Sequence, residues 1–123
     1  MKMKTLRFLL PLVFLAFIAA PVSAVAKVNP SGNWIFTASD APYEYSSGVI
    51  VVEKEKKEYL VKIRFEGDYE VSASNVKYED NELSFEVYLE GETVSLQVTV
   101  GKEEMNGTAS YSQGVIALTA KKE

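Results

Sequence analysis

Apolar and polar residues alternate with a period of two along most of the chain after residue 26. The clearest example begins at Leu83 and ends at Leu89, where every second residue is a large apolar one. No segment shows the three-to-four-residue spacing of an amphipathic helix. Because alternation places apolar side chains on one face of a strand and polar ones on the other, the pattern predicts an all-β domain.

Turn-forming residues divide these alternating segments into eight expected strands. They are expected at 33–38, 49–53, 59–65, 69–78, 83–89, 93–100, 104–110 and 115–120. Most of the intervening stretches are short and contain Gly, Asp, Asn or paired charges, which favour tight hairpins. The exception is the loop at 39–48, the longest connection after residue 26.

The fourth expected strand has an irregular alternation. Its apolar positions are odd-numbered from Tyr69 to Ala73 and even-numbered from Val76 onward. One extra residue near Ser74 and Asn75 explains the change of phase. The sequence therefore predicts a β-bulge there, which would bend the strand and help the sheet to curl.

Short connections make consecutive strands pair antiparallel, so the simplest topology is an eight-stranded up-and-down meander. A flat sheet of this kind would expose two edges and one apolar face. Closing it into a β-barrel, with the last strand paired to the first, removes both faults. Small residues at Gly107 and Ala109 would leave room for Trp34 and Phe36. A two-sheet β-sandwich uses the same alternation and stays an alternative.

Residues 1–26 have the three parts of a secretory signal peptide. A cationic start is followed by an apolar run from Phe8 to Ala20 and by small residues at Ala24 and Ala26. We expect cleavage after Ala24 or Ala26, a single domain at 27–123, and a periplasmic or extracellular location without membrane insertion. A retained amino-terminal anchor is the alternative, although the apolar run is shorter than the ~20 residues that span a bilayer.

The charge after residue 26 is strongly negative. Ten of the 13 Lys and Arg residues remain there against all 17 Asp and Glu residues, a formal charge of −7. Such a surface repels nucleic acid and anionic membranes. We interpret it as a solubilising surface, with an acidic patch for a basic partner as the alternative. Cysteine is absent, so stability must come from sheet closure and packing.

The sequence offers little for catalysis. Histidine is absent, which removes the usual general base and a common metal ligand. Carboxylates such as Glu86 and Glu90 fall on outward strand positions or turns, where nothing would separate their pKa values. The acidic turn at 79–82 lacks the spacing of a calcium-binding EF-hand. We therefore expect no enzyme activity, no cofactor and no metal.

Three short motifs indicate a family. Gly32-Asn33-Trp34 opens the first strand, Ala41-Pro42-Tyr43 lies in the long loop, and Gly48-Val49-Ile50-Val51 opens the second strand. With the eight-strand meander and the leader, they resemble the calycin group of lipocalins, fatty-acid-binding proteins and avidins, and more closely small secreted lipocalin-like proteins of bacteria. The resemblance implies that Trp34 closes one barrel end, often under an arginine from near the last strand; here only Lys121 and Lys122 stand there.

Two functional hypotheses follow from these observations. The first is a barrel that binds a small hydrophobic ligand, with the loop tyrosines at its mouth and apolar residues inside. The expected ligand-binding residues are Tyr43, Tyr45, Tyr59, Val61, Ile63, Phe85 and Leu96. The second is a filled barrel that binds a protein, as protease inhibitors do, through the loop or residues 27–31. Whether the barrel is hollow, and whether the tyrosines fold back onto the core, stays open.

Overall fold

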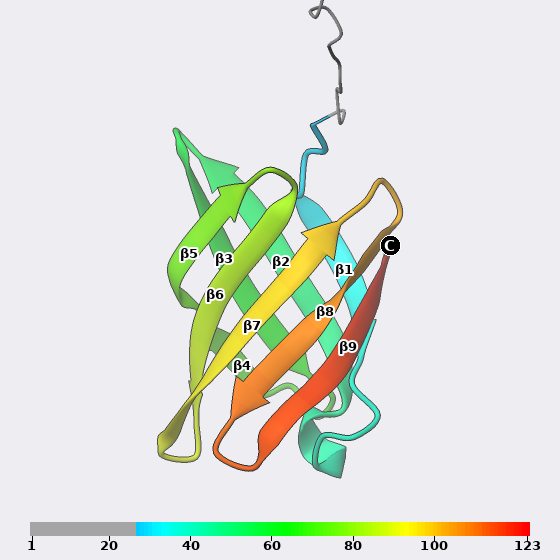
Figure 1. The fold of residues 1–123 in the computed structure, drawn as a ribbon, viewed down its shortest axis with the longest axis vertical. Coiled ribbons are helices and arrows are strands. Elements are labelled where there is room, and N and C mark those ends of the chain that lie inside the picture. Colours follow the sequence, from blue (N-terminus) through cyan, green and yellow to red (C-terminus); the bar gives the residue numbers. More distant parts are fainter. Residues whose placement is uncertain (1–26) are drawn as a thin grey trace, which may run out of the picture.

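The alternating segments form antiparallel strands, and with one exception in the middle of the chain each is hydrogen-bonded to the next along the chain (Figure 1). The computed structural model describes residues 27–123, so the expected signal peptide lies outside the described residues. Within that range no helix has the length and apolar character needed to cross a membrane. The strands are β1 (Gly32–Thr37), β2 (Ser47–Glu55), β3 (Glu58–Phe65), β4 (Glu70–Ser72), β5 (Ser74–Glu79), β6 (Glu82–Leu89), β7 (Glu92–Val100), β8 (Glu104–Tyr111) and β9 (Gly114–Lys122).

The first and last strands pair with each other, as the barrel hypothesis requires. Trp34 in β1 lies opposite Lys122 in β9, and the register continues to Thr37 opposite Thr119. The strand order is β4-β3-β2-β1-β9-β8-β7-β6-β5, so one sheet wraps around the core. The fold is a nearly closed antiparallel barrel of nine strands, which excludes the sandwich alternative.

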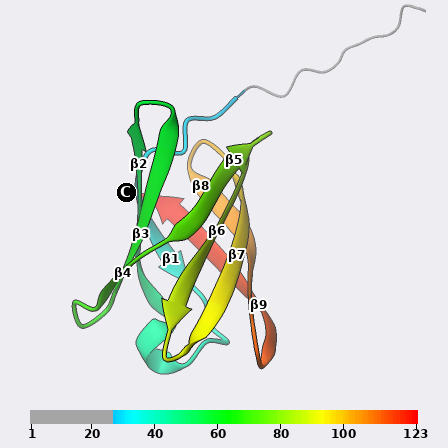
Figure 2. The ribbon, with the colours of Figure 1, turned by 90° about the vertical axis from the view of Figure 1, so that its left-hand side faces the viewer.

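The prediction of eight strands was wrong, because the segment expected to be the fourth strand changes partners halfway. β4 pairs with β3, whereas β5 pairs with β6 (Figure 2). Between them, the backbone N–H of Ala73 donates to the carbonyl of Val61 at 2.8 Å. One bent segment thus joins the two edges of the sheet and nearly completes the barrel.

The predicted bulge in this segment is confirmed. Asn75 has a φ of 52°, and the register with β6 shifts between Ser74 and Lys77. Because of the extra residue, Val71 and Val76 both pack against the core despite their odd and even positions. Tyr69 differs from the expectation of an inward position, since it belongs to the turn before β4 and is 49% exposed, stacked on the ring of Phe65.

Several strand ends also differ from the sequence prediction. β2 and β3 continue pairing as far as Glu55 opposite Glu58, where a charged turn was expected to begin at Lys54. Backbone pairing does not depend on side-chain polarity, so a charged but exposed hairpin tip extends the ladder. Lys56 makes the turn with a φ of 59°. At its other end β2 begins at Ser47, within the segment expected to be loop.

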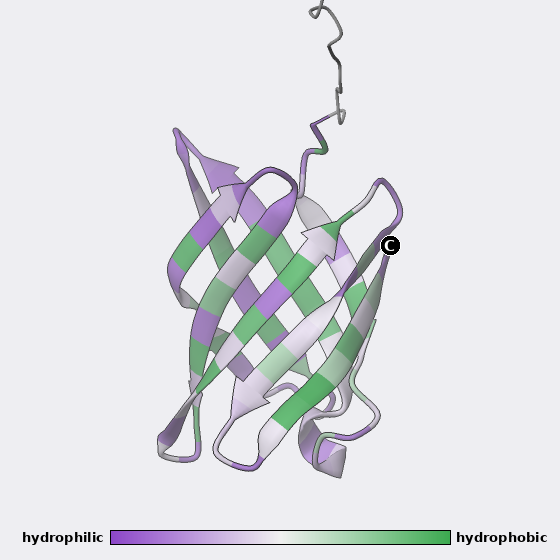
Figure 3. Ribbon diagram, viewed as in Figure 1, coloured by the Kyte–Doolittle hydropathy of each residue, from purple (hydrophilic) through white to green (hydrophobic). Residues whose placement is uncertain are grey.

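The core occupies the barrel interior, as the alternation predicts. Green and purple bands alternate along several strands in Figure 3, most clearly along β7, because successive side chains point in and out. The largest fully buried residues include Trp34, Phe85 and Met105. Of the residues expected inside, Tyr59 is only partly buried, and the others are buried: Val61, Ile63, Phe65, Leu83, Phe85, Val87, Leu96 and Val98.

One end of the barrel is closed by Trp34 and by residues 27–31, which cross that end. The indole Nε1–H of Trp34 donates to the carbonyl of Pro30 at 2.9 Å, and Trp34 has no exposed surface. The backbone N–H of Val28 donates to Oδ1 of Asn81 at 3.0 Å, and the Tyr78 hydroxyl donates to the carbonyl of Val28. These bonds anchor the segment that leads into β1.

Gly107 marks a close approach of two strands. A Cβ atom at this position would lie 1.9 Å from the carbonyl oxygen of Gln97 and 2.6 Å from Cα of Val98, both backbone atoms of β7. Real structures do not tolerate such distances, so any side chain would push β8 away from β7. The glycine lets the sheet curve tightly at this point.

We expect Gly107→Ala to lower the free energy of unfolding by about 1–3 kcal/mol or more, as overpacking does. Thr108→Ala is the control, because Thr108 is exposed on the same strand and its loss should cost at most about 1 kcal/mol. Urea denaturation of both variants measures the difference. Equal midpoints for the two variants would contradict the close approach.

Candidate functional site

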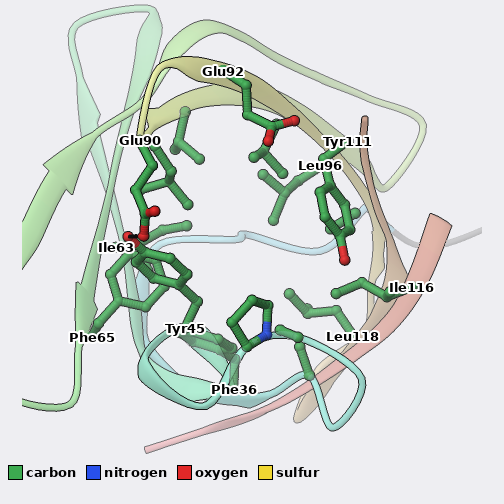
Figure 4. Close-up of a pocket in the computed structure, with 17 residues that line it drawn as sticks. Phe36, Tyr45, Ile63, Phe65, Glu90, Glu92, Leu96, Tyr111, Ile116 and Leu118 are labelled. Carbon is green, nitrogen blue, oxygen red and sulfur yellow. Dashed lines mark hydrogen bonds between the residues drawn. The ribbon is translucent and has the colours of Figure 1, made fainter. Parts of the chain in front are cut away.

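An apolar pocket opens at the barrel end opposite Trp34. Its volume is about 150 Å³, and Figure 4 looks into its mouth. Strands β1, β3, β6, β7, β8 and β9 contribute to its wall, together with the loop between β1 and β2. The lining residues are Phe36, Ala38, Ala41, Pro42, Tyr45, Ile63, Phe65, Val87, Leu89, Glu90, Glu92, Val94, Leu96, Ala109, Tyr111, Ile116 and Leu118.

The meander topology explains why these residues meet. In an up-and-down barrel, alternate connections lie at the same end. The loop after β1, the Glu90-Gly91 turn between β6 and β7, and the Ser112-Gln113 turn between β8 and β9 therefore surround one mouth (Figure 1). Residues at the ends of their strands become neighbours, although they are far apart in the sequence.

The loop after β1 is folded against the barrel by its own backbone. The N–H of Ala38 donates to the carbonyl of Ser46 at 2.8 Å and closes the loop. Inside it, Tyr43–Tyr45 form a 3₁₀ turn in which the N–H of Tyr45 donates to the carbonyl of Pro42 at 2.8 Å. The two tyrosines consequently point in different directions.

Tyr45 covers one side of the pocket. Its ring packs edge-on against Phe65 with centroids 5.0 Å apart, and its hydroxyl donates to Oε2 of Glu90 on the same side of the mouth (Figure 4). This hydrogen bond to a carboxylate, with partial burial, raises the pKa of Tyr45 to about 12. Tyr43, in contrast, is 91% exposed and lies outside the pocket lining. Of the two loop tyrosines, Tyr45 therefore folds back onto the barrel, whereas Tyr43 is exposed to solvent.

Two carboxylates stand at the rim on either side of Gly91. Glu90 and Gly91 have φ values of 49° and 85°, so both lie in the left-handed region that a two-residue hairpin turn requires. Glu92, the first residue of β7, accepts the backbone N–H of Ser112 at 2.9 Å on Oε1. That hydrogen bond holds the pKa of Glu92 below its usual value. Glu92 therefore stays ionised at neutral pH.

Tyr111 completes the rim. Its side chain, from the end of β8, lies along one edge of the mouth, with the hydroxyl pointing toward Ile116 (Figure 4). The rim therefore carries two carboxylates and two phenol groups above an apolar interior. None of the residues that line this pocket is a lysine or an arginine.

The structure brings together only some of the expected ligand-binding residues. Tyr45, Ile63 and Leu96 line the pocket. Tyr59 lies toward the closed end, where its ring contacts that of Tyr78 with centroids 5.4 Å apart. Val61 and Phe85 are buried in the core and, like the exposed Tyr43, are not part of the pocket lining.

Sequence reasoning missed the acidic rim and the β8–β9 side of the pocket. Glu90 and Glu92 were expected in a tight turn, and Tyr111 in the last hairpin, without a role at the mouth. A signal was present, because alternate turns of a meander share one barrel end. Grouping the residues beside every second turn would have placed Glu90, Glu92 and Tyr111 next to Tyr45.

The two carboxylates considered for catalysis, Glu86 and Glu90, form hydrogen bonds with different partners. Glu86 accepts a hydrogen bond from Nδ2 of Asn75 at 2.8 Å on the outer surface, whereas Glu90 accepts one from Tyr45. Between Lys27 and Glu123, no three His, Cys, Asp or Glu side chains come together in a way that could hold a metal ion. The pocket is therefore the site whose geometry suits a ligand.

Comparisons of the chain with protein-family models, with curated proteins and with solved structures find no match.

We expect Glu90→Gln to bring the pKa of Tyr45 down from about 12 toward the usual tyrosine value of 10.0, because glutamine accepts the same hydrogen bond without the charge. Phenolate absorbance during a pH titration measures this change, and Tyr45→Phe identifies the signal. Tyr78 is the internal control, since burial rather than Glu90 raises its pKa. An unchanged titration in Glu90→Gln would show that the bond to Tyr45 does not form in solution.

The raised pKa of Tyr45 also makes the contribution of its hydrogen bond to stability depend on pH. The folded chain holds the Tyr45 proton more tightly than the unfolded chain, so this bond contributes fully below pH 10 and is lost as the pH rises toward about 12.

Proposed function

We propose that this protein is an exported, lipocalin-like, non-catalytic barrel that binds a small apolar molecule reversibly at its open end. The observation that carries the proposal is the pocket of about 150 Å³, whose interior is apolar and whose few polar groups stand at the rim. Ligand sites commonly combine an apolar lining with a few polar groups that orient the ligand. The closed end is packed solid, so the open end is the place for exchange with solvent.

The size of the pocket limits the ligand. Most sites for drug-sized molecules have volumes of about 300–1,000 Å³. A cavity of about 150 Å³ lined by aliphatic and aromatic residues is known to hold benzene. We therefore propose a ligand whose buried part is a single ring or a short alkyl chain, rather than a long fatty acid or a retinoid that lies wholly within the barrel.

The lipocalin-like assignment is supported by the closed end. Trp34 follows Gly32 at the start of β1 and is wholly buried there. Nζ of Lys122, from the end of β9, lies 5.4 Å from the centroid of the Trp34 ring. A cation over this ring from near the last strand is the arrangement that the resemblance implies, with lysine in place of arginine.

A protein-binding role is the second candidate, and the exposure of Tyr43 favours it. Exposed tyrosines offer rigid contact area for a partner. Tyr43 reaches solvent from the loop, outside the pocket lining. On this hypothesis Tyr43→Ala abolishes the capture of a protein partner and leaves pocket binding and the melting temperature unchanged. Capture that persists in Tyr43→Ala would count against this surface.

The pocket proposal is tested by filling the cavity. Phenethyl alcohol, which carries one ring, should bind the wild type with a Kd on the order of 1 mM, measured by calorimetry. Ala109→Leu should abolish this binding, because Ala109 lies in the pocket wall and the larger side chain would occupy the cavity. Ala117→Leu is the matched control, since Ala117 faces outward on β9. Binding that survives Ala109→Leu, or its absence in the wild type, would overturn the proposal.

A further inference from the structure

We infer that the ligand is a small organic amine, in which a single ring or short alkyl chain carries an ammonium group. The inference rests on the proposed function and names the class of ligand for the same pocket. Glu90 and Glu92 stand at the mouth, directly above the apolar wall formed by residues such as Leu96 (Figure 4). A ligand that places its ring in the pocket would hold a substituent at the level of these carboxylates.

Glu90 has a carboxylate oxygen available for such a substituent, and Glu92 adds a second negative charge at the rim. Glu90 accepts the Tyr45 hydroxyl on Oε2, and Glu92 accepts the Ser112 N–H on Oε1. Within residues 27–123, Glu90 Oε1 accepts no hydrogen bond from the protein. The Glu92 carboxylate is bonded by both the backbone and the side chain of Ser112. The bonds to Tyr45 and Ser112 fix the orientation of the carboxylates, and Glu90 Oε1 can accept an N–H group of a cation.

The turn does not require a carboxylate at Glu90. Its φ of 49° falls in the left-handed region, and the next residue is Gly91 with a φ of 85°. In a two-residue turn of this type the first position favours Asn, Asp or Gly, which tolerate this conformation better than glutamate. Glutamate is thus a conformationally unfavourable choice at this position. Its carboxylate is long enough to bond Tyr45 and remain at the mouth.

The charge around the pocket favours a cation over an anion. Two carboxylates and no lysine or arginine line this pocket. The wider surface adds to the effect, because residues 27–123 carry a formal charge of −7. A fatty acid or aromatic acid would bring its own carboxylate against Glu90 and Glu92, whereas an ammonium group would be attracted. The phenol rings of Tyr45 and Tyr111 at the rim provide further favourable contacts for a cation.

Three probes of matched shape test the inference by calorimetry: phenethylamine, phenethyl alcohol and phenylacetate. We expect the amine to bind the wild type about fivefold more tightly than the alcohol, and the acid more weakly than the alcohol. Raising the salt concentration should weaken binding of the amine and leave that of the alcohol unchanged. If the amine and the alcohol bind equally, the inference fails while the proposed function stands. If no probe binds, the proposed function fails as well.

Variants test whether Glu90 and Glu92 cause the preference for the amine. Glu90→Gln and Glu92→Gln keep the hydrogen bonds to Tyr45 and Ser112, so the fold and the pocket should be retained. The double variant should lose the preference for the amine over the alcohol. Glu104→Gln is the control, because Glu104 is an exposed carboxylate at the other end of β8. A preference for the amine that persists in the double variant overturns the inference.

Discussion

The pairing of β1 with β9 is the interaction on which the rest of the structure depends. Every strand of this chain is apolar on one face, and an open sheet would leave that face and two edges exposed. The Trp34–Lys122 register closes the sheet on one side. On the other, the bent segment around Ala73 joins β3 to β6. A chain without cysteine thereby obtains a continuous core from backbone pairing and side-chain packing alone.

Closure also makes the two ends of the barrel different. A barrel of about eight strands is just wide enough for its own side chains, or for one small ligand. Trp34, Phe85 and Met105 fill the part toward the closed end completely. Toward the other end the inward residues include Ala38 and Ala109, and a small pocket remains. The barrel is thus filled toward the Trp34 end and hollow only near the opposite end.

The chemistry of the site lies in the turns, while its shape comes from the strands. Glu90 and Glu92 belong to one hairpin, Tyr111 to another, and Tyr45 to the loop after β1. Their mutual hydrogen bonds and those to the backbone hold polar groups at the rim and leave the interior apolar. This combination of an apolar interior and an acidic rim is the basis of the proposal that the site binds a small amine.

The sequence by itself determined the alternation, and with it the all-β class, the inward residues from Val61 to Val98, and the bulge at Asn75. These features depend on residues adjacent in the chain, whose side chains must point to opposite faces of a strand. The structure decided what depends on distant neighbours. The split of the fourth strand at Ala73 follows from a change of partner, and the pocket from strand ends brought to one mouth. No local pattern records that Glu90 would meet Tyr45, because only closure of the barrel places them together.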